Sequence, residues 1–143
     1  IENIEIIADD INCDIDALNV PYLSIRNSKV IDLSALNLDK VVKLRMQLMC
    51  ILPEMSNVKT VYCNVMNNIM LPEMPKLARL LLDDKEDPFN NPILFENIIN
   101  NKNIYIGLYI DHTNNYYKYI NMDRLRQAYQ EDTWYKYKAV NDI

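Results

Sequence analysis

The chain has 143 residues, half of them hydrophobic, which is the size of one domain with a core of its own and excludes a disordered or collagen-like protein. Fifteen basic and 20 acidic residues give a formal net charge of −5, so no overall positive field attracts nucleic acid or an anionic membrane. We therefore expect neither nucleic acid nor a membrane as the partner.

The cysteines and the start of the chain bear on the compartment. Cys13, Cys50 and Cys63 are an odd number with no C-x-x-C spacing, which favours free thiols in a reducing compartment over disulfides or a zinc site. No apolar run approaches the ~20 residues of a membrane helix, and the first ten residues are acidic where a signal peptide is basic. We expect a soluble, cytoplasmic protein. Because the sequence begins without methionine, we expect a processed chain or a piece of a longer one.

A repeat runs through most of the chain. The tetrapeptide Leu-Pro-Glu-Met occurs at 52–55 and again at 71–74, and an apolar stretch follows each copy at the same offset. Units of this pattern begin at positions 1, 20, 41, 58, 77 and 105. Their apolar fourth and sixth positions predict short strands with those side chains pointing inward and the third, fifth and seventh pointing outward. The predicted strands, parallel and side by side in sequence order, cover 4–7, 22–26, 43–47, 60–64, 79–83 and 107–111.

This spacing over residues 1–113 resembles the leucine-rich repeat family, L-x-x-L-x-L-x-x-N/C-x-L. The units with Leu-Pro-Glu-Met also resemble short repeats of bacterial secreted effectors and insect-poxvirus leucine-rich proteins. The resemblance implies an α/β solenoid with its parallel sheet on the concave face, in a viral or pathogen protein acting in host cytoplasm. The family's asparagine ladder is missing, since its position holds Asp9, Ser28, Met49, Met66, Lys85 and Thr113. An ordinary α/β domain with regularly spaced parallel strands is the alternative.

The remaining segments are expected to join and close the solenoid. With glycine present once, asparagine is expected at left-handed turn positions. Asn91 and Pro92 predict a helix starting at Ile93 and ending at Asn100, on the convex side. We expect residues 114–143 to form a C-terminal cap, with a helix over 123–130 and a strand over 133–140. The alternative is that this segment is a partner site, formed by Trp134, Tyr135 and Tyr137.

The sequence offers little for catalysis. One glycine cannot supply the Gly-rich loops of nucleotide-binding proteins or the G-x-S-x-G of hydrolases, so we expect no enzyme, no cofactor and no metal site. His112 is expected in a turn, and Cys63, at the sixth repeat position, in the core. The acidic pairs Asp9–Asp10 and Asp83–Asp84 are expected to be solvated.

The concave face is the expected functional surface. Tyrosine and arginine, which are enriched at binding hot spots, recur at its positions although the chain is acidic. In the last unit the third, fifth and seventh positions are Gly107, Tyr109 and Asp111. Strand propensity alone also favours tyrosine and threonine on an exposed sheet. We expect protein–protein recognition of a partner with an acidic segment; the alternative is a structural module of a larger protein or assembly. The predicted partner-binding residues are Tyr22, Arg26, Lys43, Arg45, Tyr62, Arg79 and Leu81.

Overall fold

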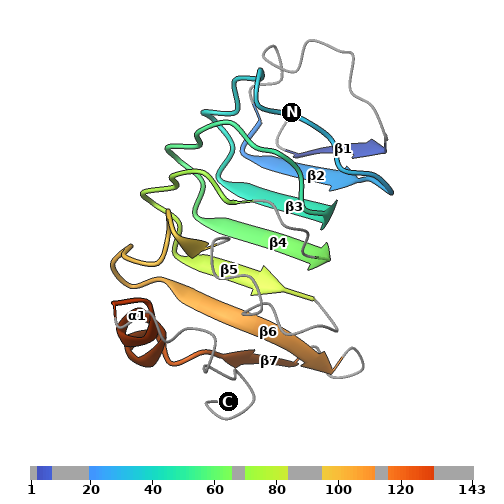
Figure 1. The fold of residues 1–143 in the computed structure, drawn as a ribbon. Coiled ribbons are helices and arrows are strands. Elements are labelled where there is room, and N and C mark those ends of the chain that lie inside the picture. Colours follow the sequence, from blue (N-terminus) through green and yellow to red (C-terminus); the bar gives the residue numbers. More distant parts are fainter. Residues whose placement is uncertain (1–2, 8–19, 66–69, 84–94, 112–115, 131–143) are drawn as a thin grey trace.

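The computed structural model describes residues 3–7, 20–65, 70–83, 95–111 and 116–130, which form one seven-stranded sheet and one helix (Figure 1). The strands lie in sequence order; β1 to β6 are parallel, and β7 is antiparallel to β6. The six parallel strands and their return segments form a solenoid, as the repeat predicted. The elements are β1 (Asn3–Ile7), β2 (Tyr22–Arg26), β3 (Lys43–Leu48), β4 (Thr60–Val65), β5 (Arg79–Leu82), β6 (Tyr105–Asp111), β7 (Tyr116–Tyr119) and α1 (Met122–Gln130).

The strand register follows the predicted repeat in five units and departs from it in the sixth. Tyr22, Lys43, Thr60 and Arg79 lie side by side, each at the third position of its unit. Arg79 then pairs with Tyr105, so the expected alignment with Gly107 is wrong by two residues. Asn103, with φ at 60°, takes the left-handed turn that starts this coil earlier. A shift of two keeps every side chain on its expected face, which is why the apolar pattern alone did not reveal it.

The core lies on one side of the sheet, where the fourth and sixth repeat positions point. These strand side chains are at most 1% exposed: Leu23, Ile25, Leu44, Met46, Val61, Cys63, Leu80, Leu82 and Ile106. The duplicated tetrapeptide supplies the opposite wall, because its leucine and methionine are buried in both copies while Glu54 and Glu73 are exposed. A single coil cannot bury its own apolar face, so the core forms between the sheet and the return segments of the stacked coils.

The predicted helix over 93–100 is wrong in the part that the structure describes. From Phe95 the chain makes a single helical turn, with the N–H groups of Ile98 and Ile99 donating to the Phe95 carbonyl at 3.0 and 2.9 Å, and continues in turns. All three side chains are buried, at most 4% exposed. Asn97 and Asn101 donate to carbonyls of the preceding coil, Leu71 at 2.8 Å and Met74 at 2.7 Å. These bonds hold the segment as another stacked coil.

Asn27 also joins neighbouring coils, from inside the structure. It is 1% exposed; its amide nitrogen donates to the carbonyl of Lys29 at 2.8 Å, and its oxygen accepts from the Leu48 N–H at 3.1 Å. Ser28, the next residue, holds the consensus asparagine position. Asn27 therefore bridges two neighbouring coils one residue before that position.

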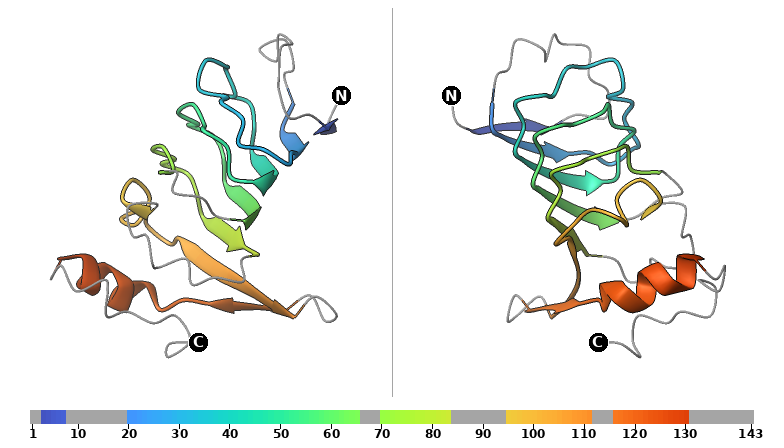
Figure 2. Two further views of the ribbon diagram at one scale, coloured as in Figure 1. Left: turned by 45° about the vertical axis from the view of Figure 1, so that its right-hand side comes forward. Right: turned by 90° about the vertical axis from the view of Figure 1, so that its left-hand side faces the viewer.

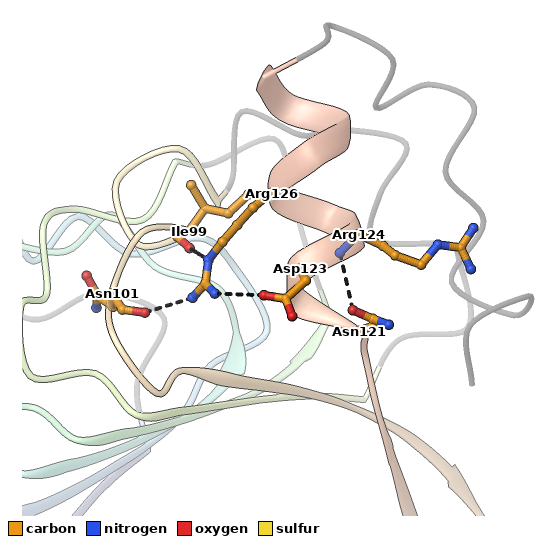
Figure 3. A network of polar contacts seen from close by, with 6 residues as sticks. All are labelled: Ile99, Asn101, Asn121, Asp123, Arg124 and Arg126. Atoms are coloured by element: carbon orange, nitrogen blue, oxygen red, sulfur yellow. Dashed lines mark hydrogen bonds and ion pairs between the residues drawn. The ribbon is translucent and has the colours of Figure 1, made fainter.

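The last described elements are β7 and α1, and Figure 3 shows the polar contacts around the helix. The predicted helix over 123–130 is confirmed and begins at Met122, capped by the Asn121 side chain, which accepts from the Arg124 N–H at 3.2 Å. Arg126 donates to the carbonyls of Ile99 at 2.8 Å and Asn101 at 2.9 Å. β7 was not predicted, and the strand expected over 133–140 lies outside the described residues.

The sheet curves so that the face opposite the core lies on the inside of the bend, and the return segments fan out behind it (Figure 2). This inner face carries the third, fifth and seventh positions of each unit, and it is the concave face. In the described part of the chain, no helix has the length and apolar character required to cross a bilayer.

Candidate functional site

The concave face brings most of the predicted residues to the surface. Arg26, Arg45 and Arg79 are exposed, and Tyr22, Lys43 and Tyr62 are half-buried. Leu81 also points to this face but is only 2% exposed, so its expected place in an accessible patch is wrong. Six of the seven predicted residues can therefore contact a partner.

Lys43 lies between two tyrosine rings at the middle of the face. Its ammonium nitrogen is 5.0 Å from the ring centre of Tyr22, its direct partner on β2, and 5.1 Å from that of Tyr62 on β4. Each ring offers its negative face to the charge, which fixes a flexible side chain in one place. The three residues form a cation–aromatic platform that spans β2, β3 and β4.

Beside this platform lies a hollow of about 440 Å³. Glu5, Ser24 and Arg45 occupy one row across β1, β2 and β3, and the short serine stands between two long side chains. The surface is therefore recessed at Ser24, in the middle of this row. This surface, the Ser24 hollow, is lined by Glu5, Ser24, Ile25, Arg26, Arg45 and Gln47.

The charges around the Ser24 hollow are unequal. Arg26 Nε lies 3.9 Å from Glu5 Oε1, and both side chains are more than half exposed. Because solvent screens the two charges, this ion pair is weak. In the part of the chain that the structure describes, no hydrogen bond or ion pair engages the Arg45 guanidinium. Two arginines therefore face one carboxylate.

Arg79 belongs to a second group at the other end of the face. Its guanidinium donates to the Tyr119 hydroxyl at 3.2 Å, and the rings of Tyr105 and Tyr119 meet edge to face with centres 6.0 Å apart. Gly107 pairs with Leu81, and both Leu81 and the Tyr119 ring come close to the space that a side chain at Gly107 would occupy. This aromatic end consists of Arg79, Leu81, Tyr105, Gly107 and Tyr119.

Sequence reasoning missed the residues that give the face its shape. Ser24, Gln47 and Glu5 were placed on the concave face by the repeat but carry no hot-spot signature, and Tyr119 comes from an unpredicted strand. For the aromatic end, the sequence offered one signal, which is Gly107. A single glycine within a strand marks a place where neighbouring groups come close.

The groups with chemical reactivity lie elsewhere or outside the described residues. Cys50 and Cys63 are free and buried, with Cys63 in the core as predicted. Burial raises the pKa of the Cys50 thiol, which disfavours the nucleophilic thiolate. Hydrogen bonds from Ser34 lower the pKa of the Asp32 carboxyl. Cys13, His112 and the pair Asp9–Asp10 lie outside the described residues, as does Asp84.

Within the described ranges no group of three metal-ligating side chains gathers. The chain was also compared with protein-family models, curated proteins and solved structures, and none of the three comparisons found a match.

Proposed function

We propose that the chain is a small leucine-rich-repeat solenoid that recognises a partner protein through its concave face and catalyses no reaction. The recurrence of the strand pattern and of the buried leucine and methionine of the tetrapeptide supports the family assignment. The resemblance to viral and effector repeats extends the proposal to a viral or pathogen protein in the cytoplasm of a host cell.

The C-terminal cap is part of the proposal. A solenoid exposes the apolar end of its last coil, and that end must be covered. β7 pairs with β6, and Ile120 and Leu125 are buried, 5% and 1% exposed, in the same core as the repeats. Arg126 ties the helix to the last return segment. These contacts support a capping role for residues 116–130.

The observation that carries the functional proposal is the cation–aromatic platform beside the Ser24 hollow. Tyrosine and arginine supply large contact area and directed hydrogen bonds at protein interfaces. Arg26, Lys43 and Arg45 gather on adjacent strands of one face although the chain is acidic overall. A partner segment with acidic residues would meet complementary charge there, with tyrosine rings alongside.

The test is capture of partners from host-cell extract by the immobilised chain, identified by mass spectrometry and compared between variants. Arg45→Glu combined with Tyr62→Ala should abolish capture of a specific partner. Lys40→Glu, an exposed cation on a return segment, makes the same change of charge as Arg45→Glu and should leave capture unchanged.

Trp134→Ala tests the aromatic C-terminal segment as the rival site. Capture that survives the concave-face changes but is lost in a folded Trp134→Ala protein would contradict the proposal. A circular dichroism spectrum of each variant establishes that it is folded.

A further inference from the structure

The Ser24 hollow has the geometry of an anion subsite. Arg45 is the direct partner of Ser24 across β2 and β3, and Arg26 stands two residues beyond Ser24 on β2. The Cα atoms of the two arginines are thus one strand and two residues apart, about 8 Å, which lets both long side chains converge on one small group. Gln47 and Ser24 add neutral hydrogen-bonding groups to the lining.

The carboxylate of Glu5 also lines the hollow. Glu5 belongs to the same row as Ser24 and Arg45, and it reaches Arg26 at 3.9 Å. Since this pair is long and largely solvated, it can be exchanged at little cost for a better one. Glu5 therefore both occupies Arg26 and opposes the entry of another negative charge.

We propose that the Ser24 hollow is a carboxylate subsite, which takes one Glu or Asp side chain of an acidic peptide segment onto Arg26 and Arg45 while Glu5 competes with it. The proposal rests on the concave face being the recognition surface, and it specifies the chemical group that binds there. Guanidinium groups suit a planar carboxylate because they donate two parallel hydrogen bonds to its two oxygens.

The charge of the hollow favours a carboxylate side chain, and its size admits one. Two arginines and Glu5 leave a net charge of about +1 in the hollow, which matches one carboxylate better than a phosphate that carries nearly two negative charges. The hollow, about 440 Å³ and open to solvent, has room for a carboxylate side chain. A peptide bound there has Tyr22 and Lys43 on the same strands as the hollow, β2 and β3, and Tyr62 on the adjoining β4.

The experiment measures fluorescence anisotropy of a dye-labelled oligoglutamate peptide titrated with the full chain at low salt. Arg45→Gln should weaken binding about tenfold or more, because hydrogen bonds to a charged group are lost. Ser24→Phe should weaken it similarly, because the ring fills the hollow while every charge stays in place. An oligoglutamine peptide with the same dye should not bind.

Glu5→Gln should tighten binding about two- to fivefold, since it removes the internal competitor. Glu54→Gln is the matched control: it makes the same change on an exposed residue of a return segment and should leave affinity unchanged. Equal gains in the two variants, or undiminished binding by Ser24→Phe, would overturn the assignment of the hollow. Preference for a phosphoserine peptide over oligoglutamate would overturn the choice of carboxylate.

Failure here is distinguishable from failure of the proposed function. If oligoglutamate binds none of the folded proteins while Arg45→Glu with Tyr62→Ala still abolishes partner capture, the carboxylate subsite is wrong and recognition by the concave face stands. If oligoglutamate binds as expected and partner capture is unaffected by the concave-face changes, the subsite stands and the recognition proposal is wrong.

Discussion

Gly107 lies directly opposite Leu81 in the pairing of β5 and β6, and a methyl group on its Cα would come within 2.9 Å of Leu81 Cδ2. The same methyl would meet the Tyr119 ring at 3.2 Å. The missing side chain thus leaves room for both Leu81 and Tyr119 on the concave face. Because its φ is not in the left-handed region, its role is one of space and not of backbone conformation.

Gly107→Ala should therefore destabilise the protein by about 1–3 kcal/mol through overpacking. Denaturant unfolding measures the change. In a Leu81→Ala background the added methyl has room, so the penalty of Gly107→Ala should shrink. An equal penalty in both backgrounds would show that the contact with Leu81 is not its cause.

Leu81→Ala is itself a test of how the concave face is built. The repeat pattern alone predicts that this change costs far less than Leu80→Ala, which opens a core cavity and should cost about 2–5 kcal/mol. Because Leu81 is as buried as core leucines, the structure predicts a loss of about 2–3 kcal/mol instead. A denaturant unfolding midpoint of Leu81→Ala equal to that of the parent would contradict the burial of Leu81.

This pair of residues shows how far sequence reasoning reached. Alternating apolar positions predicted the parallel strands and their faces, because each thin coil has to bury the same two positions. They could not predict that Leu81, at an outward position, is only 2% exposed, nor that Tyr119 comes close to the same glycine, since Tyr119 lies on a strand that follows the last repeat. The charged candidates of the face were found from composition, whereas the Ser24 hollow depends on which side chains flank a short one across three strands.

Asn27→Ala should destabilise the solenoid by about 2–3 kcal/mol. The substitution leaves the partly buried Leu48 N–H without its acceptor and the Lys29 carbonyl without its donor. Asn57→Ala is the matched control: Asn57 also bridges coils, donating to the Asp39 carbonyl at 2.6 Å, but water can replace that exposed bond. Its loss should stay below about 1 kcal/mol. Similar unfolding midpoints for the two variants would argue against a structural role for the buried bridge.

Arg126→Met tests the attachment of the helix. The change keeps most of the aliphatic stem but removes two charge-assisted hydrogen bonds, so it should cost about 1–3 kcal/mol. Lys102→Met, on an exposed neighbour of the same turn, should be nearly neutral. Thermal unfolding of both variants makes the comparison, and an unchanged midpoint for Arg126→Met would mean that the helix is held by its apolar contacts alone.

Cys50 gives stability a dependence on pH. Its pKa is raised in the folded chain by burial, so the unfolded chain loses this proton first as pH rises. The thiol of Cys50 does not lower the free energy of unfolding below about pH 8.5, the pKa of a thiol in the unfolded chain, and lowers it above that pH. The free energy of unfolding should therefore fall more steeply above about pH 8.5 in the parent than in Cys50→Ala. Parallel curves would show that the thiol does not titrate differently on folding.

Binding of a partner to the concave face can be measured from the amide chemical shifts of the labelled chain, with and without the captured partner. We expect the largest changes at Ser24, Arg45 and Tyr62, with small changes at Lys40 and Glu54 on the return segments. Changes centred on Trp134 and Tyr135, with those three strand residues unmoved, would contradict it.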